Sequence, residues 1–214
     1  MAIAAGTNLL LAPDMYVMTS NFNTMADGDH IYAIVRETGV NQDGNTTGIT
    51  MLSSAAQARL IRETYKRAGF DLRRKEDRCQ YFEAHGTGTP AGDPVESQAI
   101  WDAFFSCPGQ PKAAAEQLII GSVKTVLGHL EGCAGIAGLI KVALGLQSFF
   151  IPGNLHLGTP NPKIAPMFDS GKLLVPTTGL PWPQTDSCRR ASVNSFGFGG
   201  TNAHAILKSF HDPR

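Results

Sequence analysis

Three short motifs, each rich in glycine and polar side chains, constrain the fold of this chain more than any other feature of its sequence. They occupy residues 83–90 (EAHGTGTP), 121–129 (GSVKTVLGH) and 194–202 (NSFGFGGTN). Apolar runs before the first two motifs and on both sides of the third predict strands, at residues 79–84, 118–123, 190–193 and 203–207. Ligands and catalytic groups gather at strand ends in α/β sheets, so the motifs are candidate functional sites.

Further strands and helices are expected between and before the motifs. Strands are expected at residues 2–6 and 31–37, and helices at residues 53–68, 93–105 and 131–149. Ser53 or Ser54 could cap the first helix, with Gly69 as its stop, and Asp93 could cap the second. Glycine-, asparagine- or proline-rich segments indicate a loop at 41–48 and a surface excursion at 151–183. This alternation predicts a layered α/β fold.

The expected helix at 131–149 is unusually rich in glycine. It contains Gly132, Gly135, Gly138 and Gly145. Each glycine costs roughly 1 kcal/mol of helix propensity relative to alanine. We therefore expect this helix to pack against a core where nothing larger fits.

Composition excludes several classes of function. The 214 residues suit one domain, and 18 basic residues balance 18 acidic ones, so nucleic acid and anionic membranes are not expected partners. Charged residues are sparse at 17%, which suggests extensive burial or a subunit interface. The most apolar stretch, 136–146, is interrupted by Lys141 and too short to cross a membrane. Without a signal peptide, we expect a soluble cytoplasmic protein.

Four cysteines bear on cofactors and redox setting: Cys79, Cys107, Cys133 and Cys188. They show no CxxC spacing and no histidine pair at zinc-ligand spacing, so we expect a reduced compartment, no metal and no cofactor.

The motifs carry side chains suited to proton transfer and to stabilising an oxyanion. His85 and His129 each follow a strand, and Lys124 could hold a carboxylate or orient His129. The residues that we expect to contact substrate are Thr87, Thr89, Asn194, Phe196, Phe198 and Gly199, with backbone N–H groups of the glycine loop forming an oxyanion hole. The alternatives are a structural histidine in a turn, a solvated lysine and a simple tight hairpin.

In this order, the three motifs resemble the β-ketoacyl synthase (ketosynthase) domain of the thiolase-like superfamily. Residues 36–44 (RETGVNQDG) and 48–51 (GITM) are most similar to highly reducing polyketide synthases of fungi. The resemblance covers nearly the whole chain. It implies that His85 and His129 form the active-site pair, supported by Lys124, and that the loop near Phe198 lies beside the reacting carbonyl. It also implies a substrate of acyl and malonyl units on a phosphopantetheine arm.

Two departures from the family pattern shape the expected function. The nucleophilic cysteine of the family lies upstream of the segment that Met1 begins, and residues 21–30 lack an expected insertion. We therefore expect a single truncated domain, with 1–48 as a remnant of the N-terminal half and 49–214 as the C-terminal half. Cys133, four residues after His129 and expected on the same helix face, could substitute as nucleophile. The interpretation that we favour makes Cys133 a small buried residue.

Without a nucleophile, ordinary chain extension should fail. We favour an enzyme that uses His85 and His129 as acid and base on a polyketide intermediate, through an enolate. The reaction could be aldol or Claisen cyclisation, dehydration, isomerisation or decarboxylation. The alternatives are a non-catalytic partner that docks on or completes a polyketide synthase, and a decayed duplicate. The resemblance places the strand at 2–6 at a dimer interface, and an exposed apolar edge invites pairing, so we expect a homodimer.

Overall fold

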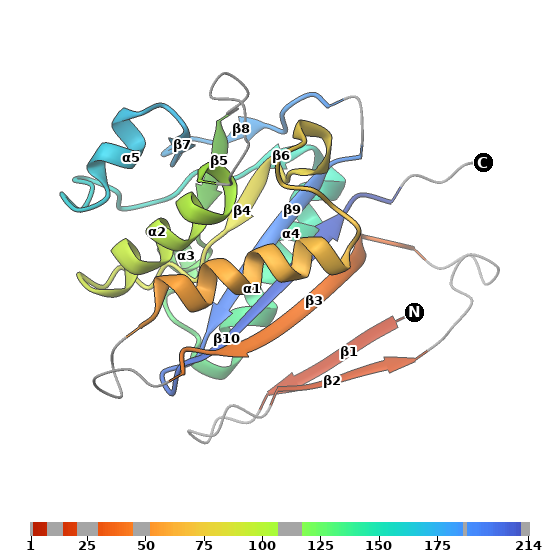
Figure 1. Ribbon diagram of the computed structural model, residues 1–214. Helices are drawn as coiled ribbons and strands as arrows, with labels where there is room; N and C mark the ends of the chain where they lie inside the picture. The colour runs from red at the N-terminus through yellow and green to blue at the C-terminus, as the bar shows by residue number, and fades with distance from the viewer. Residues whose placement is uncertain are drawn as a thin grey trace.

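A six-stranded sheet forms the centre of the fold, as the computed structural model shows (Figure 1). The structure describes residues 30–44, 52–106, 117–185 and 188–210, together with the backbone of residues 2–7 and 15–20. In sheet order the strands are β3 (Ile34–Gln42), β10 (Thr201–Lys208), β9 (Arg190–Phe196), β4 (Tyr81–Glu83), β5 (Leu118–Gly121) and β7 (Leu173–Leu174). β10 runs antiparallel to both of its neighbours, β3 and β9, whereas β9, β4, β5 and β7 are mutually parallel.

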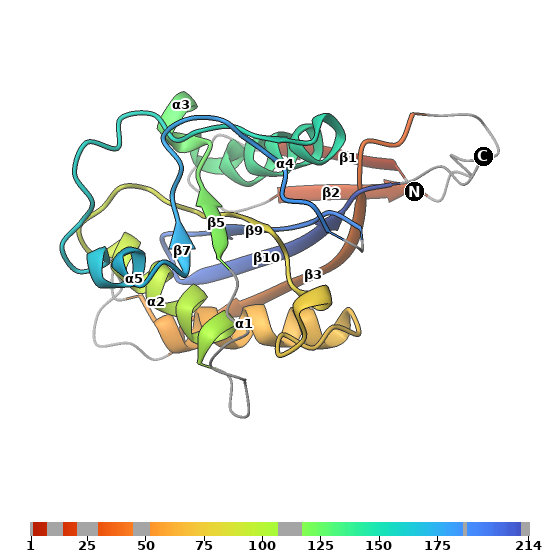
Figure 2. The ribbon, with the colours of Figure 1, turned by 90° about the horizontal axis from the view of Figure 1, so that it is seen from above.

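Helices cover both faces of the sheet. Figure 2 shows α1 (Ser54–Arg67) and α2 (Gly92–Phe105) on one face and α4 (Ala134–Ser148) on the other. Each face has its own apolar core. Tyr65, Phe82 and Phe104 lie in the core beneath α1 and α2, and Val142 and Leu146 lie in the core beneath α4. This is the layered α/β arrangement that the sequence predicts.

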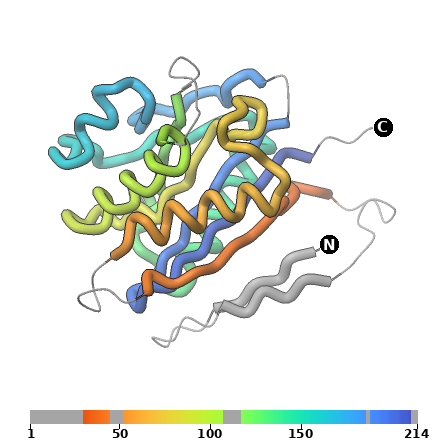
Figure 3. The backbone as a smooth tube through the Cα atoms, viewed as in Figure 1, coloured from red at the N-terminus to blue at the C-terminus, as the bar shows by residue number. Residues whose placement is uncertain are grey.

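Smaller elements complete the described chain, whose path Figure 3 traces. They are β1 (Ala2–Thr7), β2 (Met15–Ser20), η1 (Lys75–Asp77), α3 (Lys124–Leu127), η3 (Glu131–Cys133), β6 (Phe150–Ile151), α5 (Ala165–Asp169) and β8 (Leu180–Pro181). β1 pairs antiparallel with β2, and β6 pairs with β8. The expected excursion at 151–183 therefore holds short elements of its own. Within the described residues, no helix combines the length and apolar character that crossing a membrane requires.

Three local predictions are confirmed. Ser53 caps α1, because its hydroxyl accepts the backbone N–H of Ala56 at 3.2 Å. The helix stops before Gly69, whose φ of 79° lies in the left-handed region that glycine adopts without strain. The β-hairpin around the third motif is also present, with Phe196 opposite Asn202.

The glycines of α4 allow this helix to approach the sheet, as expected. A Cβ on Gly135 would lie 2.9 Å from Ser195 Oγ, and one on Gly138 would lie 3.3 Å from side-chain carbons of Glu83 and Val193. A Cβ on Gly145 would lie 3.0 Å from the backbone oxygen of Phe150. Gly132 differs, because it lies in η3 and is exposed.

Several predicted boundaries are wrong. β3 lies at Ile34–Gln42 rather than 31–37, since it pairs with β10 as far as Gln42. The α-helix expected from 131 begins at Ala134, because Glu131 has a φ of 47°. Asp93 lies inside the first turn of α2 and does not cap it. Residues 21–29, 45–51 and Cys107 lie outside the described chain.

Candidate active site

The ends of three parallel strands bring the motifs together. β4 and β5 are adjacent and parallel, with Glu83 opposite Gly121. β9 lies on the other side of β4, with Val193 opposite Glu83. Residues 84–91 and 122–130 thus leave the same edge of the sheet, and Phe196 ends β9 close to them.

His85 and His129 form a pair of perpendicular rings. Their ring centroids lie 5.4 Å apart with an interplanar angle of 86°. The His85 ring also packs against Phe196, with 5.5 Å between the centroids. His85 is half-buried, whereas His129 is exposed. The two histidines of the predicted pair are therefore neighbours in the structure.

A backbone N–H donates to the Nδ1 atom of each histidine. Phe196 N donates to His85 Nδ1 at 3.2 Å, and Glu131 N donates to His129 Nδ1 at 3.0 Å. A backbone N–H can only donate, so each Nδ1 must be the acceptor. In the neutral state both rings therefore carry their proton on Nε2.

Local electrostatics keep both rings neutral. Burial, reinforced by the Lys124 and His129 charges, lowers the pKa of His85 from 6.5 to about 3. Partial burial, followed by the Lys124 charge, also lowers the pKa of His129, and Glu131 opposes this. At neutral pH the pair thus presents two Nε2–H donors and no imidazolium.

Carboxylates from the first turns of α2 hold the loop that carries His85. Glu96 is buried and accepts the backbone N–H groups of His85 at 2.8 Å and Gly86 at 2.9 Å. Asp93 accepts the N–H of Gly88 at 3.0 Å instead of capping its own helix. Gly86 and Gly88 have φ values of 49° and 74°, which the turn requires and larger residues rarely adopt.

A second buried network supports the loop that carries Lys124. Lys141 on α4 donates to Glu83 Oε2 and to the Tyr81 hydroxyl, each at 2.7 Å. The other oxygen of Glu83 accepts the N–H of Val123, the residue before Lys124. Lys124 is half-buried, and burial lowers its pKa. Sequence reasoning missed the roles of Glu83 and Lys141, although a lysine within an apolar stretch was a usable signal.

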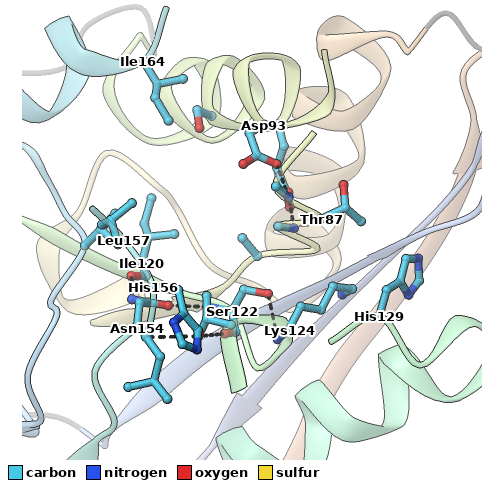
Figure 4. A pocket seen from close by; sticks show the side chains of 18 of the residues that line it. Thr87, Asp93, Ile120, Ser122, Lys124, His129, Asn154, His156, Leu157 and Ile164 are labelled. Atoms are coloured by element: carbon cyan, nitrogen blue, oxygen red, sulfur yellow. Dashed lines mark hydrogen bonds between the residues drawn. The ribbon is translucent and has the colours of Figure 1, made fainter. Parts of the chain in front are cut away.

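A cavity of about 430 Å³ opens beside the pair. Figure 4 shows the Lys124 side chain between Ser122 and His129, with Thr87 and Asp93 nearby. His129 lines the cavity, and His85, which is not among the lining residues, packs edge-on against the His129 ring. Thr89, predicted to contact substrate with Thr87, accepts the N–H of Gly92 at 2.9 Å and is exposed.

The glycines of the third motif form the hairpin turn, whereas its first residue, Asn194, lies in the interior. Gly197 N and Gly200 N bond within the hairpin turn, so Phe198 and Gly199 are the residues whose N–H groups could serve an oxyanion. Phe198 is 78% exposed. Asn194 differs from the prediction, because its side chain is only 3% exposed and bonds to Glu96 and His204. We assign it to support of the His85 loop rather than to substrate contact.

The premise for Cys133 as a substitute nucleophile is wrong. His129 precedes η3 and Cys133 ends it, so the two residues do not share one α-helical face. Glu131, between them, adopts a left-handed conformation. In the described part of the chain, no group of three histidine, cysteine, aspartate or glutamate side chains is placed to hold a metal ion.

Comparison with known families and structures defines the class. The family described as "Beta-ketoacyl synthase, C-terminal domain" matches residues 32–158, and the "Ketoacyl-synthetase C-terminal extension" matches residues 160–214. The chain belongs to the β-ketoacyl synthase family. Its fold is similar to that of the ketosynthase from module 6 of the bacillaene synthase of Bacillus subtilis 168, with a TM-score of 0.80 and 37% identity. That match covers 92% of this chain and 34% of the other.

Similar full-length relatives include fungal polyketide synthases. The highly reducing polyketide synthase milA of Cordyceps militaris is 48% identical over 98% of this chain, and the reducing polyketide synthase BOA6 of Botryotinia fuckeliana is 50% identical over 98%. This chain spans 10% of the length of each. The alignment with milA runs over 244 positions, more than the 214 residues of this chain, so milA has additional residues inside the aligned region.

Proposed function

We propose that His85 and His129 stabilise an enolate on a polyketide-type thioester, and that the favoured reaction is decarboxylation of a malonyl or β-keto acid group. The C–C bond to the carboxylate breaks, CO₂ leaves, and the electron pair forms an enolate whose oxygen the two imidazole N–H groups bind. Carbon protonation by water completes the reaction. This chemistry requires no nucleophilic thiol and no cofactor.

The backbone hydrogen bonds to both Nδ1 atoms carry this proposal. Each neutral ring has its Nδ1 lone pair occupied and its Nε2 protonated, so neither has a lone pair ready to take a proton from carbon. Decarboxylation supplies the enolate electrons without a base. It therefore suits this pair better than the base-dependent cyclisations, dehydrations and isomerisations that the motifs also allow.

Lys124 and Thr87 have supporting roles in the proposal. Both line the cavity with His129. The half-buried Lys124 ammonium would attract the substrate carboxylate into the cavity. The Thr87 hydroxyl would form a hydrogen bond with the polar arm of the thioester. The N–H groups of Phe198 and Gly199 are candidates for a second carbonyl.

A malonyl thioester assay tests the proposal. CO₂ release from malonyl-pantetheine is compared among wild type, His129→Gln and His129→Leu. Glutamine retains an N–H near the Nε2 position, whereas leucine has similar size and no donor. We expect leucine to lower kcat by about 10²–10³-fold, the usual effect of removing one oxyanion donor, with partial rescue by glutamine. Unchanged turnover in both His129→Leu and His85→Leu would eliminate the proposal.

A second candidate function is docking on, or completion of, a ketosynthase within a polyketide synthase. An apolar groove of about 390 Å³ between α3, α4 and β6 favours it. Leu127, Ile140, Leu144 and Phe150 line this groove and are 45–55% exposed. Clustered exposed apolar side chains mark interaction surfaces. Co-purification with the ketosynthase region of a reducing synthase, weakened by Leu144→Glu, would support this role.

We also propose a C₂ homodimer through β1. In the described chain β1 pairs with β2 on one edge of a two-stranded sheet, which leaves its other edge for a second copy. A monomeric mass in sedimentation equilibrium would contradict it.

A further inference from the structure

A third histidine lies in the core, outside the proposed reaction. His204 is in the middle of β10 and 2% exposed. Its ring lies between aromatic rings, with centroid distances of 6.2 Å to Tyr65 and 5.7 Å to Phe82. Nδ1 lies 2.7 Å from Asn194 Oδ1, while Nε2 is buried with no hydrogen-bond partner among the described residues. Burying an imidazole nitrogen without a partner is costly, so this placement needs a reason.

The donors and acceptors in the chain from Glu96 through Asn194 to His204 can be assigned by starting at Glu96. Glu96 accepts two backbone N–H groups, which can only donate, and an ionised carboxylate can only accept. The Asn194 atom at 2.9 Å from Glu96 Oε1 is therefore the amide nitrogen. Asn194 Oδ1 must then face His204, so His204 Nδ1 carries a proton. Its tautomer is opposite to that of His85 and His129.

We propose that His204 is a positioning residue for the candidate active site, acting through Asn194 and Glu96 on the backbone of His85. Its Nδ1–H holds the Asn194 amide in the orientation that points nitrogen at Glu96. Glu96 in turn holds the N–H groups of His85 and Gly86. The effect on turnover rests on the proposed decarboxylation, whereas the effect on loop geometry does not.

A histidine suits this position because its ring also fills the aromatic core. A flipped Asn194 would set its oxygen against the Glu96 carboxylate, and a donor at His204 Nδ1 opposes the same flip from the other side of the amide. Burial lowers the pKa of His204 to about 3. The ring therefore remains neutral, with its single proton on Nδ1, over the pH range in which Glu96 can act as an acceptor.

Wild-type NMR tests the assignment without any variant. Long-range ¹H–¹⁵N spectra distinguish the two neutral tautomers of each histidine. We expect an Nδ1–H signal from His204, protected from exchange, and Nε2–H signals from His85 and His129. An Nε2–H tautomer or an imidazolium at His204 near neutral pH would overturn the proposal, whether or not the protein releases CO₂.

Paired variants test the consequence. His204→Phe keeps an aromatic ring and removes the donor, whereas His204→Asn places an amide nitrogen where Nδ1 lies. We expect the phenylalanine variant to shift the amide signals of His85 and Gly86 and to lower kcat by roughly tenfold, with little change in KM. The asparagine variant should restore both readouts in part.

Two outcomes of this comparison contradict the proposal: unchanged His85 and Gly86 amide signals in a folded His204→Phe protein, and equal impairment in both variants. If wild type proves inactive on malonyl-pantetheine, the proposed reaction fails while the amide signals still decide the positioning role. If neither variant folds, the wild-type tautomers decide it.

Discussion

At the residue scale, the protonation state of the two histidines distinguishes enolate binding by neutral rings from a mechanism that uses a protonated ring. The pKa of His85 is lowered to about 3 and that of His129 is lowered from 6.5. Neutral rings are the active form in our proposal, because protonation would remove the Nδ1 acceptor that anchors each ring. Activity is therefore lost as pH falls through the lowered pKa of His129.

The direction of this pH dependence can be tested by a pH–rate profile. We expect kcat/KM for CO₂ release to stay level from about pH 8 to 6.5 and to fall only below the ordinary histidine value of 6.5. A steady loss that begins above pH 6.5 would instead indicate a histidine with a raised pKa. The measurement is initial rate against pH at low substrate concentration.

At the element scale, one buried ion pair adds to the apolar contact between α4 and the sheet. Lys141 and Glu83 have side chains 13% and 2% exposed, 2.7 Å apart. Glu83 also anchors the N–H of Val123, so the ion pair couples α4 to the loop that carries Lys124. Both partners are needed, because an unpaired buried carboxylate is strongly unfavourable.

Lys141→Met should therefore destabilise the protein by about 3–5 kcal/mol. Methionine fills a similar volume but leaves Glu83 without its cation. Urea unfolding measures the change, and Lys163→Met, at an exposed position, is the control. The ion pair would not have the role assigned here if Lys141→Met and Lys163→Met were equally stable.

At the scale of the whole molecule, burying His204 neutral links folding to pH. The unfolded chain binds a proton at His204 below about pH 6.5, whereas the folded chain does so only near pH 3. The unfolded state thus binds more protons in this window, and the free energy of unfolding falls as pH is lowered from about 6.5 to 3.

Between pH 6.5 and 5, this site should lower the free energy of unfolding of wild type by about 1.5 kcal/mol more than that of His204→Phe. Urea unfolding at the two pH values measures the difference. His156→Asn is the control, since its side chain is exposed, and it should follow wild type. Equal acid sensitivity of wild type and His204→Phe would show that His204 is not buried in the neutral form.

Local patterns in the sequence were sufficient for part of this structure. The cap of α1 and its stop at Gly69 depend on side chains within one turn of the helix ends. The β9–β10 hairpin depends on adjacent apolar runs around a glycine turn. Boundaries failed where distant contacts set them, as at β3, whose end is determined by pairing with β10.

The sequence by itself determined the layered α/β class, the three motifs and the family to which the chain belongs. Only the tertiary structure decided how the motif side chains are protonated and held. Phe196 N donates to His85 across 111 residues of sequence, and Asn194 reaches Glu96 across 98. Hydrogen bonds between such distant residues leave no periodic or local pattern, because each depends on how the sheet and helices pack. The roles of His204, Glu83 and Lys141 emerge from that packing.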